Sequence, residues 1–409
     1  MDWFYSKPAT ETQEMRYTSS FEKLGHSEAV LLSKHIKTPF RRHLVQPKGQ
    51  SWSINTLVIN GPTSQGPDES SNLIDPRRPT LVLTHGYGSG LGFFYANYDH
   101  LAAMRDSLGR PVQIVAIDWL GMGRSSRPLF EKRSRSSQKG KDDEQLIAAA
   151  EDYFVDSFET WREELGLETF ALAGHSLGGY LSGCYALKHP QRLTSLTLIS
   201  PFGLPAHPQA SVPLGEVSKQ LPLAQRLFLS AWNNNFTPQW VLRGMGPYGS
   251  KFASRVVARR FPAMDTNDQS LISNYLYNLS TLRPAAGEYA LNALMELRMV
   301  PVQPTSHYEA LERSTSESRR SSNAGTFGLF ARNPLGVRLG KGLPAHMPVN
   351  ILFGDNDWMF GNRNAIVSLD LIARRKKTKL TVIDGAGHHL YLDNPGQFAD
   401  SVNASVRSL

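Results

Sequence analysis

The stretch FALAGHSLGGYLSG, residues 170–183, constrains the fold of this chain more than any other part of its sequence. Residues 170–173 form a short apolar run typical of a buried parallel strand, and apolar residues recur at helical spacing after the glycines. Ser176 therefore falls where a strand turns directly into a helix. Such a turn strains the backbone at its central residue, and Gly174 and Gly178 relieve the crowding because they lack a Cβ atom. The pattern predicts a nucleophile elbow, with a tight turn carrying an incidental serine as the alternative.

Apolar runs of β type recur along the chain and begin at Ile54, Thr80, Val112, Thr169, Leu193, Val349 and Leu380. Several of these runs are apolar throughout, as strands buried on both faces are. Helical patterns over residues 143–165 and 177–188 separate the middle runs. This alternation predicts an α/β fold with a doubly wound, mostly parallel sheet.

The alternation of strands and helices stops in residues 201–346, where the patterns are helical or irregular and none predicts a strand. We expect this segment to be a lid inserted between two parts of the α/β core, residues 51–200 and 347–409. Its apolar and aromatic residues would line an acyl pocket or pack against the core: Phe228, Leu229, Trp232, Phe236, Trp240, Val241 and Leu242. Two polar, serine-rich stretches, residues 131–144 and 312–325, are predicted to be disordered.

Residues 1–50 are predicted to form a basic, amphipathic N-terminal arm. Its helix should start at a cap near Ser19 and place Leu24, Leu31, Leu32 and Ile36 on one face. No acidic residue lies between Glu28 and Asp68, whereas Lys34, Lys37, Arg41, Arg42 and Lys48 do. In a chain of net charge +8, this span is either a surface for anionic lipids or an ordinary solvated face, and the sequence leaves both open.

The composition and the motifs exclude several classes of protein. No apolar run approaches the roughly 20 residues of a membrane span, and the start lacks the features of a secretory signal. The single cysteine, Cys184, excludes an internal disulfide and agrees with a reducing compartment. Without zinc-ligand spacing, a dinucleotide fingerprint or a nucleic-acid module, we expect no metal, cofactor or nucleic acid. We expect an intracellular protein peripheral to a membrane, in the mitochondrion, the cytoplasm or at lipid droplets.

A nucleophilic serine needs a base that takes its proton and a carboxylate that orients the base. Asp357 lies in the loop after one late β-type run, with Asp355 as its competitor. His388 follows a flexible glycine-containing segment after the last run, with His389 beside it. The chain order Ser176, Asp357, His388 is the order of one serine-hydrolase fold, which argues against an incidental serine.

The oxyanion of such a reaction needs two backbone amides as hydrogen-bond donors. We expect one from Leu177, directly after the serine, and one from Tyr87 in the HGYGSG loop. His85 in the same loop is expected to be a structural hydrogen-bonding residue. The DWLGMGRSS turn, which starts at Asp118, is expected to shape the floor of the site.

Together the motifs HGYGSG, DWLGMGRS, GHSLGG, GDNDWM and GAGHHLYLDNP resemble the α/β-hydrolase superfamily over residues 80–408, with the lid inserted. HHLYLD also matches the pattern of a histidine, four residues and an aspartate in a lipid-active subgroup. That subgroup includes a lipolysis co-activator, lysophosphatidic acid acyltransferases and the fungal cardiolipin-specific deacylase. Asp393, the aspartate of this pattern, precedes Asn394 and Pro395 at an expected helix start, so we expect it to be an N-cap.

The motifs and the resemblance together predict a serine carboxylester hydrolase with the triad Ser176, His388 and Asp357. Its expected substrates are acyl esters of glycerophospholipids or lysophospholipids, with cardiolipin as one candidate. A lysophospholipid acyltransferase is the nearest alternative, because a lipid hydroxyl can resolve the same acyl-enzyme. A catalytically idle lipid-surface scaffold or lipase co-activator is a second alternative, since some relatives in the subgroup have lost the nucleophile that Ser176 supplies here.

Overall fold

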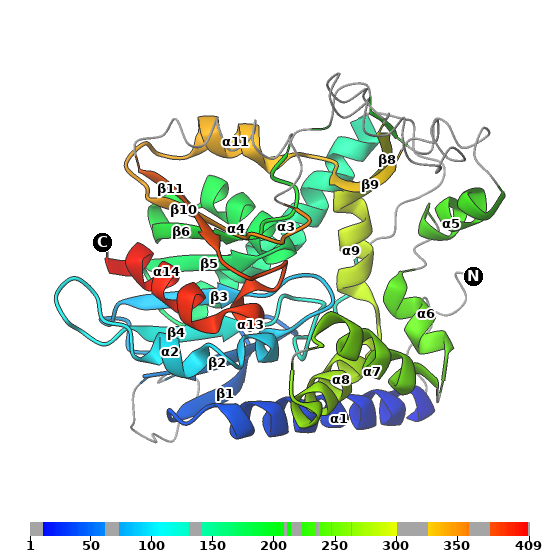
Figure 1. Cartoon of the computed structure of the whole chain (residues 1–409), viewed down its shortest axis with the longest axis horizontal. Helices are drawn as coiled ribbons and strands as arrows, with labels where there is room; N and C mark the ends of the chain where they lie inside the picture. The colour runs from blue at the N-terminus through cyan, green and yellow to red at the C-terminus, as the bar shows by residue number, and fades with distance from the viewer. Residues whose placement is uncertain are drawn as a thin grey trace, which may run out of the picture.

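The fold is built on an eight-stranded sheet in the order β1-β2-β4-β3-β5-β6-β10-β11 (Figure 1). The computed structural model describes residues 11–61, 73–130, 141–205, 207, 211–213, 223–233, 237–246, 248–262, 264–300, 326–359 and 377–407. The strands are β1 (Phe40–Val45), β2 (Ile54–Ile59), β3 (Thr80–Thr84), β4 (Gln113–Ile117), β5 (Phe170–His175), β6 (Leu193–Ile199), β10 (Val349–Gly354) and β11 (Thr378–Ile383). Strand β2 runs antiparallel to both neighbours, and the six strands from β4 to β11 are parallel.

Helices cover both faces of this sheet. One face packs against α3 (Lys141–Glu164), α4 (Leu177–Lys188), α9 (Ala286–Leu294) and α11 (Leu335–Gly342). The other packs against α1 (Glu11–His35), η2 (Leu91–Phe94), α2 (Tyr98–Ala102), α8 (Thr266–Thr281), α13 (Leu390–Asp393) and α14 (Pro395–Arg407). The short helix η3 (Pro190–Arg192) leads into β6. Because side chains alternate along a strand, Val82 enters one core and its neighbours Leu81 and Leu83 enter the other.

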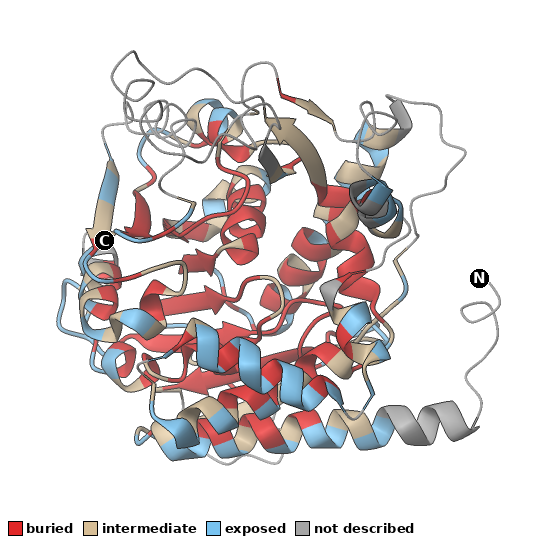
Figure 2. Ribbon diagram, turned by 45° about the vertical axis from the view of Figure 1, so that its right-hand side comes forward, coloured by how far each residue is buried: buried red, intermediate tan, exposed pale blue. Residues whose placement is uncertain are grey.

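The sequence prediction of an α/β fold with a mostly parallel, doubly wound sheet is confirmed. Each of the seven β-type runs forms a strand of the main sheet, and the two predicted helices are α3 and α4. Figure 2 shows why the runs are so apolar: the buried residues concentrate in the sheet and in the helix faces that pack on it.

The N-terminal segment differs from the separate arm predicted for residues 1–50. Strand β1 pairs with β2 along its whole length and forms an edge of the main sheet. Helix α1 starts at Glu11 instead of near Ser19, although all four apolar residues of its expected inner face are buried. The sequence did not predict β1 because two arginines, Arg41 and Arg42, interrupt its apolar pattern.

Three of the five lysines and arginines in residues 34–48 bind other parts of the fold. Arg42 Nη1 donates to Glu28 Oε1 at 2.8 Å, and Arg41 Nη2 donates to the carbonyl of Leu73 at 2.7 Å. Lys34 Nζ lies 2.6 Å from Asp268 Oδ1 of α8. Lys37 and Lys48 are exposed, so the alternative of an anionic lipid surface over residues 34–48 stays a prediction.

The segment between β6 and β10 contains strands as well as helices, which corrects the expectation of no strand in residues 201–346. Within the described residues its helices are α5 (Leu223–Asn233), α6 (Pro238–Gly244), α7 (Tyr248–Arg260), α8, α9 and α11. A second, antiparallel sheet has the order β7-β8-β9, with β7 (Val212–Pro213), β8 (Met295–Val300) and β9 (Thr326–Ala331). Strand β8 was not predicted because Glu296 and Arg298, which bind each other, break its apolar run.

Two further expectations concern disorder and membrane spans. Residues 131–140 and 312–325 of the serine-rich stretches lie outside the described residues, whereas residues 141–144 form the start of α3 and are helical, against the prediction. Within the part of the chain that the structure describes, no helix is both long enough and apolar enough to cross a bilayer.

A buried polar network fastens α1 to the core and to α8. The side chain of Glu28 is fully buried and accepts hydrogen bonds from Arg42, Arg124, Asn55 and Tyr275 at 2.8–3.4 Å. Burial, and then the carboxylate of Asp118, raise the pKa of Glu28, and the two arginines only partly offset this. The network therefore depends on Glu28 as its common acceptor.

We expect Glu28→Ala to lower the free energy of unfolding by about 3 kcal/mol, because it leaves buried donors without their acceptor. The control is Lys34→Ala at the end of the same helix, which removes a partly exposed ion pair and should cost less than about 1 kcal/mol. Denaturant unfolding measures both, and equal losses would contradict the assignment of the anchor to Glu28.

Candidate active site

The C-terminal ends of the parallel strands bring the predicted site residues to one edge of the sheet. Ser176 follows β5, and Ser200 follows β6. Asp357 and His388 lie in the loops after β10 and β11, and the loop of residues 85–89 follows β3. In an open parallel sheet, this edge is where ligands bind.

The backbone at Ser176 adopts the strained conformation expected of an elbow, with φ 52° and ψ −114°. A Cβ atom on Gly178 would lie 2.5 Å from the carbonyl oxygen of His85, and one on Gly174 would collide with Gly178 itself. Both glycines are thus required by close backbone contacts. The amide of Ser176 is held by the carbonyl of Ile199 at 2.9 Å, so the turn is fixed against β6.

The structure brings Ser176, His388 and Asp357 together. His388 Nε2 lies 3.0 Å from Ser176 Oγ, and His388 Nδ1 lies 3.3 Å from Asp357 Oδ1. One ring nitrogen thus faces the hydroxyl and the other faces the carboxylate, which is the arrangement a base and its orienting acid need. Ser176 and His388 are half-buried, whereas Asp357 is buried.

A second serine, Ser200, stands between the acid and the base, and sequence reasoning missed it. Its hydroxyl donates to Asp357 Oδ2 and accepts from His388 Nδ1 at 2.8 Å, a shorter distance than the one from this nitrogen to Asp357. Ser200 is fully buried and has a positive φ of 46°. The available signal was its position, directly after the strand that neighbours the elbow strand.

The carboxyl group of Asp357 is held in its charged form. Burial raises its pKa, but hydrogen bonds from His388 and Ser200, together with the attraction to His388, bring the pKa below its ordinary value. The amide of Met359 donates to Asp357 Oδ1 at 3.0 Å as well. A charged acceptor is what fixes the tautomer of His388, with a hydrogen on Nδ1 and a lone pair on Nε2 facing Ser176.

His175, inside the elbow motif, positions the loop of the base. Its Nε2 lies 2.9 Å from the carbonyl oxygen of His388, which can only accept, so Nε2 carries the hydrogen. Burial, followed by the neighbouring His388 and His389, lowers the pKa of His175 well below its ordinary value. The ring is therefore neutral and ties the loop after β11 to the end of β5.

The two competing residues named from the sequence have other partners. Asp355 is exposed and accepts from the amide of Ala386 at 2.9 Å, so it shapes the loop of the base without facing His388. His389 packs among aromatic rings, including Phe261 at 5.7 Å between ring centroids. Burial, and then His388 and Arg260, lower the pKa of His389 to about 3.

The expected capping role of Asp393 is wrong. Asn394 caps α14, because its Oδ1 accepts from the amide of Gln397 at 3.2 Å. Asp393 instead accepts from the amide of Gly387 at 2.9 Å and lies 3.3 Å from the guanidinium of Arg260, the last residue of α7. The aspartate of the HHLYLD motif thus fixes the residue before His388 and connects it to α7.

The loop expected to supply an oxyanion donor lies against the elbow. A Cβ atom on Gly86 would lie 3.0 Å from that of Ser176, and Tyr87 is the next residue. Leu177 is the first residue of α4, so helix geometry leaves its amide without an acceptor inside the helix. The two amides thus belong to segments that meet at Ser176.

His85 has the structural hydrogen-bonding role expected of it, and Asp118 holds the turn that it starts. His85 is buried, its Nε2 accepts from the amide of Trp119 at 3.2 Å, and its Nδ1 donates to the carbonyl of Gly86. Burial lowers the pKa of His85 to about 4. Asp118 accepts from the amides of Leu91 and Arg124 and so closes the turn after β4.

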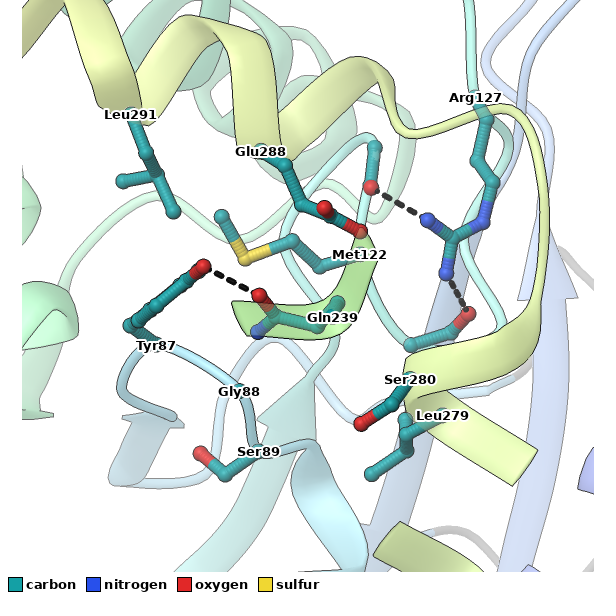
Figure 3. Close-up of a pocket in the computed structure, with 12 residues that line it drawn as sticks. Tyr87, Gly88, Ser89, Met122, Arg127, Gln239, Leu279, Ser280, Glu288 and Leu291 are labelled. Atoms are coloured by element: carbon teal, nitrogen blue, oxygen red, sulfur yellow. Dashed lines mark hydrogen bonds between the residues drawn. The ribbon is translucent and has the colours of Figure 1, made fainter. Parts of the chain in front are cut away.

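A small pocket adjoins the loop after β3 (Figure 3). It is lined by Tyr87, Gly88 and Ser89 of that loop, by Gly121, Met122, Gly123 and Arg127 of the turn after β4, and by Gln239, Leu279, Ser280, Glu288 and Leu291. The hydroxyl of Tyr87 donates to the side chain of Gln239 on α6. Arg243 neutralises Glu288 at 2.6 Å. The segment between β6 and β10 therefore forms part of the pocket wall.

Trp358, the residue after Asp357, is exposed and lies beside His388. Its ring centroid lies 5.3 Å from that of His388, and 68% of the residue is exposed.

Among the described side chains, no group of three or more histidines, cysteines, aspartates or glutamates is arranged to hold a metal ion.

Comparison with known proteins identifies similar chains. Residues 79–395 match a family model described as alpha/beta hydrolase fold. A 1-acylglycerol-3-phosphate O-acyltransferase of Arabidopsis thaliana is 32% identical over 344 residues, which cover 80% of this chain and 66%, just under two thirds, of that protein. A (Lyso)-N-acylphosphatidylethanolamine lipase of Mus musculus is 31% identical over 327 residues, covering 78% of this chain and 77% of the lipase.

A solved structure shares the fold. The carboxylesterase CesB (YbfK) of Bacillus subtilis superposes with a TM-score of 0.55 at 16% identity, and the match covers 96% of this chain and 99% of that one. The superfamily resemblance inferred from the sequence motifs is thereby confirmed, and so is the similarity to lipid-active members.

We expect Ser200→Gly to slow the labelling of Ser176 by a fluorophosphonate about tenfold. Glycine tolerates the positive φ of this position but lacks the hydroxyl. The reason is that His388 loses its nearest Nδ1 partner. The pH dependence of labelling should shift as well, which a purely structural effect would not produce. An unchanged rate and pH profile would mean that Asp357 alone orients the base.

The neighbours Asp393 and Asn394 offer a matched pair of variants. Asp393→Ala should slow the labelling of Ser176 about tenfold, because the loop of His388 loses its anchor at Gly387, whereas Asp393→Asn keeps an acceptor oxygen and most of the rate. Asn394→Ala removes the cap of α14 and should cost about 1 kcal/mol of stability at an unchanged labelling rate. Unchanged labelling in Asp393→Ala would refute the anchoring role.

Proposed function

The chain belongs to the alpha/beta hydrolase fold family, and on this premise we propose that it is a serine carboxylester hydrolase for acyl esters of glycerophospholipids or lysophospholipids. The observation that carries the proposal is the series of contacts from Ser176 through His388 to Asp357 at a strained elbow. A serine held by chance in a turn would have no reason to face a histidine whose other nitrogen faces a buried carboxylate.

In the first step, Ser176 Oγ attacks the ester carbonyl carbon while His388 Nε2 takes the hydroxyl proton. The carbonyl oxygen becomes an oxyanion, which the amides of Tyr87 and Leu177 are proposed to bind. Asp357, with the hydroxyl of Ser200, stabilises the imidazolium that forms. When the tetrahedral intermediate collapses, His388 gives its proton to the departing lipid alcohol, and the acyl group remains on Ser176.

In the second step, water attacks the acyl-enzyme. His388 Nε2 takes a proton from the water as its oxygen bonds to the acyl carbon, and the oxyanion forms again. Collapse breaks the bond to Ser176 Oγ, which regains a proton from His388. The fatty acid leaves and the free enzyme is restored.

The lipid class of the substrate is supported by the names of the relatives. One is named for acylation of a glycerol phosphate and the other for cleavage of a phosphatidylethanolamine derivative. The segment of residues 201–346 is proposed to act as a lid, since Gln239, Leu279 and Glu288 on its helices line the pocket beside the loop after β3. An intracellular location at a membrane surface is part of the same proposal.

Acyl transfer is a second candidate, favoured by the acyltransferase name of the plant relative. The chemistry differs only in the second step, where a hydroxyl of a lysophospholipid replaces water. Both reactions would need Ser176, because Asp393 binds Gly387 and Arg260 and has no contact with His388 among the described hydrogen bonds.

We expect Ser176→Ala and His388→Ala each to reduce ester turnover by about 10⁴-fold or more, and Asp357→Asn by about 10⁴-fold. The three proteins should unfold at parental denaturant concentrations. The assay follows a purified glycerophospholipid by mass spectrometry, and Asp355→Asn is the control because Asp355 does not face the base. Full turnover in Ser176→Ala would reject Ser176 as the nucleophile. No fluorophosphonate labelling and no turnover in the parent would reject the proposal in favour of an idle scaffold.

Adding an isotopically labelled lysophosphatidic acid to the same assay separates the two candidates. We expect free fatty acid as the main product, and any labelled phosphatidic acid should disappear with it in Ser176→Ala. Acyl transfer that persists in Ser176→Ala but is lost in Asp393→Asn would establish a separate, serine-independent reaction at the HHLYLD motif.

A further inference from the structure

Helices α6 and α7 expose a group of large apolar side chains. Trp240 and Val241 on α6 are 46% and 52% exposed, and Tyr248, Phe252 and Val256 on α7 are 69%, 45% and 43% exposed. We call these five residues the α6–α7 apolar face. Single exposed apolar residues are ordinary on a protein surface, but several on neighbouring helices mark a surface that binds something.

Helix α7 carries an exposed apolar stripe beside the stripe that packs inside the fold. Tyr248, Phe252 and Val256 are spaced by four residues and form one stripe along the helix. The residues that follow each of them, Gly249, Ala253 and Val257, are buried. The buried stripe packs against α8, where a Cβ on Gly249 would lie 2.9 Å from the ring of Tyr277. The apolar side of α7 is therefore wider than the part that its own fold buries.

A basic stripe lies beside the apolar one. Lys251, Arg255 and Arg259 are also spaced by four residues, and all three are exposed. Within the described part of the chain, no acidic side chain pairs with any of them. The surrounding sequence has no acidic residue between Glu216 and Asp265, although seven lysines and arginines lie there. The occupant of this face should therefore be apolar and negatively charged.

A phospholipid bilayer with anionic head groups has this combination of properties. A helix that lies in the bilayer interface places apolar side chains among the acyl chains and basic ones among the head groups. Tryptophan and tyrosine, both present here, favour the same depth. Both stripes run along the length of α7, as in a helix that lies parallel to a membrane surface.

The face adjoins the candidate active site at both of its helices. Gln239, the residue before Trp240, lines the pocket and binds Tyr87. Arg260 at the end of α7 lies 3.3 Å from Asp393, which holds the amide before His388. A bilayer on this face would therefore touch α6, which forms part of the pocket wall, and α7, which contacts the loop of His388 through Asp393.

We propose that the α6–α7 apolar face, with its basic stripe, docks the protein on anionic phospholipid bilayers. The docking itself is argued from α6 and α7 alone. Its role in delivering lipid to Ser176 rests on the proposed function.

The test measures binding of the full chain to phosphatidylcholine vesicles with and without phosphatidylserine, by co-sedimentation. Ser176→Ala is used throughout, so that hydrolysis cannot consume the vesicles. Phe252→Ser with Val256→Ser should weaken binding to both vesicle types about tenfold or more. Lys251→Gln with Arg255→Gln and Arg259→Gln should weaken only the binding to phosphatidylserine vesicles, about tenfold or more, and added salt should reduce this difference.

The control is Leu108→Ser, which changes an apolar residue in the turn before β4 that is 75% exposed, more than Phe252 or Val256. This variant should bind vesicles like the parent. Parental binding by both variant sets, or no binding by the parent, would overturn the proposal. If the parent forms dimers without lipid and the protein with Phe252→Ser and Val256→Ser does not, the face serves self-association. That result would also overturn the proposal. In proteins that retain Ser176, turnover of a soluble short-chain ester should be unchanged by either set. Vesicle binding without any such turnover in the parent would keep the docking proposal and reject the hydrolase proposal.

Discussion

The close approach of three backbone segments at the elbow is the constraint on which the rest of the site depends. The strand before Ser176, the helix after it and the loop after β3 meet where Gly178 contacts the carbonyl of His85. No side chain larger than hydrogen fits there, and only a strained serine backbone connects the strand to the helix. The loop after β3 carries Tyr87, and Leu177 directly follows Ser176, so both proposed oxyanion donors belong to segments that meet at the elbow.

The sequence predicted those parts of the fold and site that follow from short-range pattern. The central parallel strands β3, β4, β5 and β10 were predictable because they are buried, which makes most of their residues apolar. The order of Ser176, Asp357 and His388 was predictable because each follows a recognisable strand. Ser200, by contrast, is an ordinary residue in the sequence, and only the pairing of β6 with β5 and β10 places its hydroxyl between acid and base.

Charge was the least predictable property, because a basic residue can be used inside the fold or left on its surface. The acid-free span that includes Arg41 and Arg42 suggested a free basic surface, yet these side chains bind Leu73 and Glu28. Lys251, Arg255 and Arg259 show the opposite outcome on α7. The distinction depends on contacts distant in sequence: Glu28 lies on a helix that packs against the sheet, whereas the outer side of α7 faces solvent.

The role of Asp393 also depends on a contact distant in sequence, the one with Arg260. This role affects how hydrolysis and acyl transfer would be related in this chain. A motif aspartate that orients His388 would compete with Asp357 for one ring nitrogen, but Asp393 binds the backbone of Gly387 and the guanidinium of Arg260. Its effect on chemistry must then pass through the position of His388, which serves attack by water and by a lipid hydroxyl equally. Under the proposed function, the motif would therefore not choose between the two reactions. That choice would fall to the acceptor that the pocket and α6–α7 admit to the acyl-enzyme.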